Sequence, residues 1–281
     1  MMKKIWTIIS VIVLILIIGG IGIGIFYYFT REPEVQLYLA IHCEPGAVPS
    51  SLDQPETYWP FLKTMVTKAD QYGIKLNLLF NPQWAHYILQ NTSRFFMIRN
   101  WEANGHEIGV HHHGPHHGGW NGYTNQVDYQ GDPRYLGNIS DMMIPLNQLP
   151  ASGQIVSGCI STQDDIEYDC PEGLLYTTYG GGDKLDHLWS FPDYGYYNDQ
   201  TVLRVTHALF GSEKNEVVID LDQFKELYQE KNNEFVMGLV WHAFNYAENP
   251  STYIDFFSYL QQEGIQTHTL PEILGNMTIY Y

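Results

Sequence analysis

Histidine is concentrated in one short stretch of this sequence. Six of the chain's twelve histidines fall between His106 and His117, in the run HEIGVHHHGPHH. Neutral imidazole is the commonest protein ligand for zinc-like metals near neutral pH. The run is internal, is interrupted by Gly114 and Pro115 and follows an apolar segment, whereas an engineered tag is a plain repeat at a terminus. These features predict a metal site, and the alternative is a solvated histidine-rich loop that binds no metal.

A second set of possible ligands follows the apolar run over residues 35–41. The next three residues are His42, Cys43 and Glu44. Successive side chains of a strand point to opposite faces, so His42 and Glu44 share one face and Cys43 takes the other. A histidine and a carboxylate therefore leave the end of the first expected strand side by side, where they can bind a metal or handle a proton.

Two further positions also follow apolar runs. His242 comes directly after the run 235–241, and Asp164 and Asp165 come shortly after the run 154–160. A lone histidine at a strand end is either a hydrogen-bonded core residue or a proton donor. The adjacent carboxylates either assist metal binding and proton transfer or form a solvated turn.

The elements that must position these residues alternate in type. Apolar runs of strand length are separated by amphipathic runs of helix length. This order is typical of a parallel α/β architecture, whose sites gather at the carboxyl ends of the strands. Besides the histidine-rich strand, the expected strands are residues 35–41, 74–80, 154–160, 217–219, 235–241 and 265–270, and the expected helices are residues 58–72, 84–90, 94–103, 221–230 and 250–264.

The segment 118–150 is polar, aromatic and rich in turn residues, with a short helix expected near residues 137–149. Its Trp120 and Tyr123 are expected to be exposed beside the metal site. Aromatic faces stack on the apolar faces of sugar rings, so both residues are substrate-binding candidates, and the alternative is a loop that packs on itself. The segment 177–199 is crowded with Gly, Tyr and Asp, and its role is not readable from the sequence.

The run Gly105-His106-Glu107-Ile108-Gly109-Val110-His111 resembles the second motif of the carbohydrate esterase family 4, or NodB-like, polysaccharide deacetylases. In that family a G-H-E-I-G strand ends in a histidine pair that binds a divalent metal. The resemblance extends over residues 35–274 and is dense only at this motif. It implies an irregular, incomplete (β/α) barrel, and it implies hydrolysis of N-acetyl groups on the amino sugars of a cell-surface or extracellular polysaccharide.

The resemblance does not decide which histidines bind the metal. The family's two histidines are four residues apart, but the fourth residue after His111 is Pro115. Strand alternation favours His111 and His113, joined by His117 and then by His116. The pairs that stay open are His112 with His116, His113 with His117, and His111 with His116 or His117.

The first motif departs further from the family pattern. The family has two adjacent aspartates, a metal ligand and a general base, where this chain has His42-Cys43-Glu44. Glu44 is therefore expected either as the third ligand or as the base with His42 as ligand, and Asp164 or Asp165 is a possible substitute base. His242 resembles the family's general acid for the leaving amine. No Arg-x-Pro motif of the family's third kind follows the histidine run.

The expected cofactor is a divalent metal, with zinc as the first choice and cobalt, nickel and manganese also compatible with mixed nitrogen and oxygen ligands. Two other interpretations stay open. One is a catalytically lapsed surface protein that binds glycan or metal, and the other is a different glycan or amide hydrolysis on the same barrel.

The first thirty residues form a separate unit in the sequence. Residues 5–29 carry no charge and are rich in Ile and Val, a length sufficient to cross a bilayer, and the only preceding charges are lysines. We expect residues 1–30 to be a single-pass anchor with a cytoplasmic N-terminus, and residues 31–281 to be an extracytoplasmic domain. A cleaved signal peptide is the alternative, but no small-residue cleavage site follows Phe29.

Charge and cysteine content limit the possible partners. Acidic residues outnumber basic residues by 31 to 14, and the basic residues are scattered, so a nucleic-acid partner is not expected. A glycan substrate and the membrane are the expected partners, and the sequence indicates no protein partner. Cys159 and Cys170 either form one disulfide or stay free, and Cys43 is expected to be buried and unreactive.

Overall fold

The computed structural model describes residues 35–275, apart from residues 47, 49, 161–162, 181–186, 212–217 and 231–235. The expected anchor over residues 1–30 lies outside the described residues. None of the helices within the described ranges is long and apolar enough to cross a bilayer.

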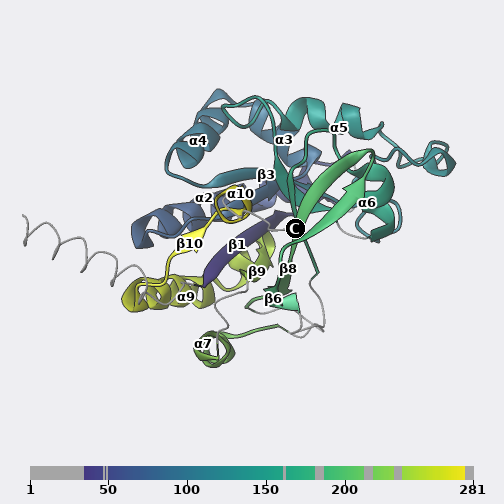
Figure 1. The fold of residues 1–281 in the computed structure, drawn as a ribbon. Coiled ribbons are helices and arrows are strands. Elements are labelled where there is room, and N and C mark those ends of the chain that lie inside the picture. The colour runs from purple at the N-terminus through teal and green to yellow at the C-terminus, as the bar shows by residue number, and fades with distance from the viewer. Residues whose placement is uncertain are drawn as a thin grey trace, which may run out of the picture. The chain divides into compact units, whose positions relative to one another are not determined.

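Within the described residues, seven parallel strands close into a barrel (Figure 1). They follow the order β1-β2-β3-β4-β5-β8-β9, and β9 pairs again with β1. A (β/α) barrel is therefore confirmed, but its ring of strands is closed by the pairing of β9 with β1, whereas the resemblance implied an incomplete barrel. The barrel strands are β1 (Gln36–Cys43), β2 (Asn77–Phe80), β3 (Glu107–His112), β4 (Ser157–Ile160), β5 (Tyr176–Gly180), β8 (Gln200–Leu209) and β9 (Val236–His242).

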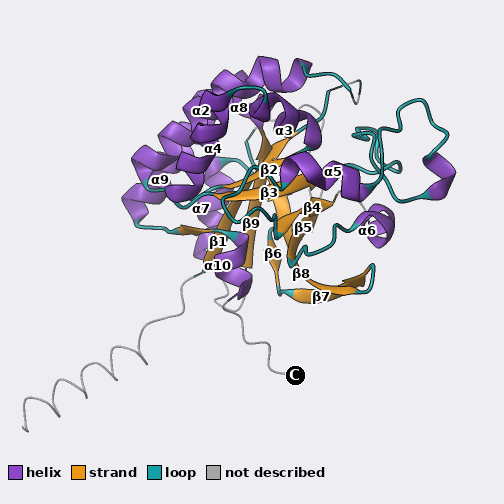
Figure 2. Cartoon of the chain, turned by 90° about the horizontal axis from the view of Figure 1, so that it is seen from above, coloured by secondary structure: helices purple, strands orange, loops and turns teal. Residues whose placement is uncertain are grey.

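Helices cover the outer face of the barrel, as Figure 2 shows for the purple elements around the orange strands. Outward-facing Leu37, Leu39 and Ile41 of β1 belong to the large apolar core that includes Met65 of α2 and Phe257 of α9. The elements outside the barrel are α2 (Asp53–Tyr72), α3 (Pro82–Leu89), α4 (Thr92–Ala103), η1 (Val127–Tyr129), α5 (Ile139–Leu146), α6 (Gln163–Asp169), α7 (Leu221–Gln229), α8 (Ala243–Glu248) and α9 (Pro250–Glu263).

A second, smaller apolar cluster fills the barrel interior. It contains Tyr38 and Ala40 of β1, which alternate with the outward-facing leucines of the same strand. The next inward position on β1 is His42, and the following outward position is Cys43. Strand alternation therefore brings His42 into the barrel, as the sequence predicted.

The C-terminal segment closes the end of the barrel at which the strands begin. The helix α10 (Leu270–Gly275) places Leu270, Ile273 and Leu274 in the inner cluster. The strand β10 (Thr267–His268) pairs with the first residues of β1, and the Asn77 amide donates to the Leu39 carbonyl and accepts from the Leu270 N–H. The opposite end, where the strands finish, carries the polar residues.

The region between β5 and β9 contains more strand than the sequence predicted. The strands β6 (Trp189–Ser190) and β7 (Asp193–Tyr197) connect β5 to β8 in place of a helix. β7 and β8 form a hairpin whose turn residues Asn198 and Asp199 have φ of 47° and 59°. Asparagine and aspartate tolerate this conformation better than other non-glycine residues, which makes the tight turn possible.

One half-buried carboxyl makes stability depend on pH. Glu107, at the start of β3, accepts a 2.7 Å hydrogen bond from Ser157 Oγ, and burial raises the pKa of Glu107 from 4.5 to about 7. Between these two values the unfolded chain releases a proton that the folded chain keeps. The free energy of unfolding therefore falls as the pH rises from about 4.5 to about 7.

We expect Glu107→Gln to remove this loss of stability. The free energy of unfolding of the variant minus that of the unsubstituted chain should rise by about 2 to 3 kcal/mol from pH 4.5 to pH 8. Urea unfolding at the two pH values measures this difference. The control is Glu226→Gln at an exposed position of α7, which should show no such gain. An equal difference between Glu107→Gln and the parent chain at both pH values would contradict the assignment.

Candidate metal centre

Five imidazoles and one carboxylate converge at the carboxyl ends of the barrel strands. Four of the imidazoles are almost fully buried, with exposed fractions between 1% and 6%. They come from β1, β3, β8 and β9, so the barrel brings together residues that are up to 200 positions apart in the sequence. The six residues are His42, Glu44, His111, His113, His207 and His242.

Glu44 lies at the centre of this group. Its Oε1 atom is 3.1 Å from His111 Nε2 and 3.1 Å from His242 Nε2. Its Oε2 atom is 2.7 Å from His113 Nε2. Three imidazole nitrogens from the ends of two strands thus surround one carboxylate, which directly follows the end of a third strand.

The spacing of the donors fits a divalent cation. The Nε2 atoms of His111 and His113 are 2.9 Å apart, and with Glu44 they form a set whose ligand atoms all lie within 4.8 Å of one another. Ligand atoms bound at about 2.1 Å to one cation lie roughly 3.0 to 3.4 Å apart. Buried histidine and glutamate groups here are therefore able to hold a metal ion, as two histidines and a carboxylate do in many metal sites.

The electrostatic setting favours the protonation states that metal binding requires. Burial alone would raise the pKa of Glu44, but the imidazoles of His113 and His111 hold that pKa well below its ordinary value. Burial lowers the pKa of His111 to about 4. The carboxylate is thus ionised and the His111 imidazole is neutral at physiological pH, which are the forms that bind metals.

His42 packs against the same donors from the side of β1. Its ring stacks on His111 with centroids 4.0 Å apart, and it meets His242 edge-on at 5.5 Å. Its Nε2 atom is buried and has no hydrogen-bond partner within the described residues. Burial, reinforced by His111, holds the pKa of His42 well below its ordinary value, so the ring is neutral.

His207 on β8 was missed by the sequence analysis. Its ring meets His42 edge-on at 5.3 Å, and its Nδ1 atom is 2.7 Å from Thr178 Oγ1. The Tyr38 hydroxyl donates its only proton to the Thr206 carbonyl. Thr178 must therefore donate to Tyr38 and accept from His207 Nδ1–H. This series of hydrogen bonds fixes the tautomer of His207 and leaves its Nε2 without a proton.

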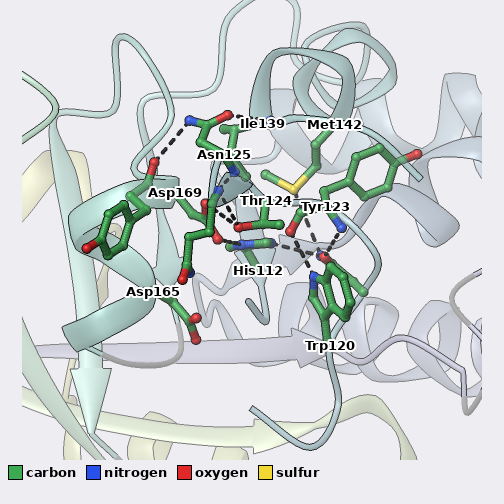
Figure 3. A network of polar contacts seen from close by, with 12 residues as sticks. His112, Trp120, Tyr123, Thr124, Asn125, Ile139, Met142, Asp165 and Asp169 are labelled. Atoms are coloured by element: carbon green, nitrogen blue, oxygen red, sulfur yellow. Dashed lines mark hydrogen bonds and ion pairs between the residues drawn. The ribbon is translucent and has the colours of Figure 1, made fainter. Parts of the chain in front are cut away.

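His112 points away from the metal centre into a polar network under the following loop (Figure 3). Its Nδ1 atom is 3.1 Å from Asn121 Oδ1, and its Nε2 atom is 3.2 Å from Asp169 Oδ2. Asp169 also accepts from the Thr124 hydroxyl and the Asn125 N–H. The structure thus places His112 with the loop, and the proposed pair of His112 with His116 is not brought together at the centre.

The two exposed histidines of the run make different contacts. His116 Nδ1 is 3.0 Å from Asp165 Oδ1, so the structure pairs His116 with a buried carboxylate outside the donor sets. His117 stacks on His113 with centroids 3.9 Å apart, and its Nδ1 accepts from the Gly119 N–H. Asp164 is exposed on α6. Neither aspartate has a hydrogen bond to the Glu44 group among the described contacts.

The expectation that Trp120 and Tyr123 are exposed is wrong. Their exposed fractions are 3% and 8%, because the loop packs on itself. The Trp120 indole N–H donates to the Tyr123 carbonyl, and the Arg134 guanidinium covers the indole face at 4.9 Å. The stacking faces proposed for a sugar are thus occupied by other parts of the loop.

The three cysteines are free and buried. Cys159 lies on the inner wall of the barrel, within a donor set that it shares with His42 and His111. Cys170 follows α6, where the Gln200 side-chain amide donates to its sulfur. The disulfide that the sequence left open between Cys159 and Cys170 is therefore not formed.

Comparison with known proteins gives information on the fold alone. No protein-family model matches the sequence, and no curated protein matches it. Among solved structures, 4-alpha-glucanotransferase from Thermococcus litoralis is similar, with a TM-score of 0.54 and 11% sequence identity. The match covers 87% of this chain and 41% of that protein, so the chain spans less than half of its neighbour's length. At this identity the likeness supports a shared barrel architecture.

We expect His112→Ala to act on stability and not on metal binding. The substitution leaves the fully buried Asp169 with one partner fewer, so the free energy of unfolding should fall by about 3 kcal/mol. Bound metal per folded chain should stay unchanged. Urea unfolding and elemental analysis test both parts, with His86→Ala at an exposed position of α3 as control. Loss of metal at unchanged stability would instead make His112 a ligand.

Proposed function

We propose that this chain is a metal-dependent hydrolase that removes N-acetyl groups from amino sugars of a cell-surface or extracellular polysaccharide. The observation that carries the proposal is the convergence of Glu44, His111 and His113 within one ligand shell. Two of these residues lie at the end of the strand that carries the deacetylase-like G-H-E-I-G run. The barrel opens at that end, which is where sites of parallel α/β barrels form.

The residues present fit a divalent cation, for which zinc is the first choice. When bound by Glu44, His111 and His113, such a cation polarises the amide carbonyl and lowers the pKa of a water molecule toward neutrality. The neutral His111 imidazole and the ionised Glu44 carboxylate are already in the forms that bind metals at neutral pH. Burial of the donors keeps bulk water out of the site and strengthens their electrostatic effect.

His242 supplies a second function at the same place. Its backbone N–H lies 2.8 Å from Asn245 Oδ1, and its Nδ1 lies 2.9 Å from the same atom. The His242 side chain also accepts from the Asn245 backbone N–H. These contacts hold the ring with Nε2 facing Glu44, where Nε2 either carries a proton to the departing nitrogen or binds a cation, and the two roles differ in metal stoichiometry.

The number of carboxylates favours amide hydrolysis over glycosyl transfer. A retaining glycosidase mechanism uses two carboxyl groups about 5 to 5.5 Å apart. In the described part of the chain, Glu44 is the one carboxylate bonded to the imidazole group, and Asp165 is engaged with His116. The glucanotransferase neighbour therefore supports the architecture, and its reaction is not carried over to this chain.

The single carboxylate also supports the second candidate function. The resembled family has two aspartates in its first motif, and this chain has His42 and Glu44 there. A barrel that lost its base would bind glycan or metal without hydrolysis. In either case the apolar run 5–29 would anchor the domain at the outer face of a membrane, which is part of the proposal.

The test is acetate release from chito-oligosaccharides by the purified full-length chain. We expect release that a chelator abolishes and added zinc restores. Glu44→Gln should lower kcat/KM at least about 100-fold, whereas Glu263→Gln, at an exposed position of α9, should leave it unchanged. Metal and oligosaccharide binding without acetate release would favour the lapsed binding protein, and acetate release in chelator would refute metal dependence.

A further inference from the structure

Of the three donor sets found among the described residues, two contain Glu44. Glu44, His111 and His113 form the first set, and His42, Glu44 and His242 form the second. Within each set the ligand atoms lie within 4.8 Å of one another. Each set found among the described residues has three members, so one ion does not collect all five side chains without their rearrangement. Glu44 is the only member common to both.

His242 presents its Nε2 atom to Glu44. The His242 side chain accepts from the Asn245 backbone N–H, and Asn245 Oδ1 accepts from the His242 backbone N–H. These contacts hold the ring so that Nε2 lies 3.1 Å from Glu44 Oε1. A cation bound by both atoms would replace the hydrogen bond between them, with release of its proton.

His42 is the third member of the second set. It lies level with His242 in the register of β1 and β9, and it is only 6% exposed. One of its ring nitrogens has no partner among the described residues. A buried polar atom without a hydrogen bond is costly, and coordination to a cation removes that cost for an imidazole.

We propose that Glu44 bridges two divalent cations, the first held by His111 and His113 and the second by His42 and His242. The inference rests on the proposed hydrolase function and deepens it, because it makes His242 a ligand instead of a proton donor. The expected ions are zinc-like cations that accept mixed nitrogen and oxygen ligands. A paired site of this kind suits hydrolysis, since the two cations stabilise different oxygens of the reacting group.

Metal stoichiometry of the full-length chain tests the proposal. After saturation with zinc and dialysis, elemental analysis should give two zinc ions per chain. His42→Ala and His242→Ala should each give one, and His113→Ala should also give one. His86→Ala should keep two. Thermal unfolding followed by circular dichroism shows that each variant is folded.

Two further variants separate the bridged site from other zinc sites. Cys159→Ser should keep two ions, because the thiol belongs to a set that lacks Glu44; loss of one ion would overturn the bridge. The double variant His116→Ala with His117→Ala should also keep two ions. Loss of one ion there, with His242→Ala unchanged, would show that the second ion sits on exposed loop histidines.

Manganese gives an independent readout. Two Mn²⁺ ions that share a carboxylate should give an exchange-coupled electron paramagnetic resonance spectrum, which His242→Ala should convert to the six-line spectrum of an isolated ion. One ion per chain with a six-line spectrum would overturn the second site while leaving the proposed function and a proton-donor His242 intact. No bound metal at all would overturn both proposals.

Discussion

The barrel mouth depends on the burial of one negative charge. Glu44 is surrounded at 2.7 to 3.1 Å by nitrogens of His113, His111 and His242. A buried carboxylate is costly unless other groups compensate its charge, and here those groups come from β3 and β9. β9 and, through the intervening β2, β3 must therefore be in register with β1 before Glu44 is compensated. This requirement links closure of the barrel to assembly of the centre.

Strand register explains how these residues reach the same place. β1 pairs His42 with His242 of β9 and with Leu79 of β2, and Leu79 pairs with Gly109 of β3. The next inward position on β3 is His111, which lies one step closer to the mouth. Such a stagger accompanies strand tilt in closed barrels. Gly109 permits the close packing, because a Cβ there would lie 2.5 Å from the Leu79 side chain.

Local patterns predicted the donors that sit on strong strands. Alternation after an apolar run was enough to place His42, and it also favoured His111 over His112. His207 was missed because its strand follows the Gly-rich and Tyr-rich segment, although the β-branched residues Val202, Val205 and Thr206 marked a strand. The burial of Trp120 was not predictable locally, since it depends on Arg134, fourteen residues later, covering the indole. Likewise, pairing of His116 with Asp165 requires β3 and β4 to be neighbours.

The shared architecture with a glucanotransferase does not decide the reaction, because chemistry depends on the side chains at the mouth. Here burial keeps the imidazoles of His42 and His111 neutral by lowering their pKa, and it lowers the pKa of His207 to about 3. The Thr178 and Tyr38 hydroxyls fix its tautomer without adding charge. Glu44 thus remains the local negative charge among many nitrogen lone pairs. Such a site attracts cations, and its described residues offer no fixed positive charge to an anionic group.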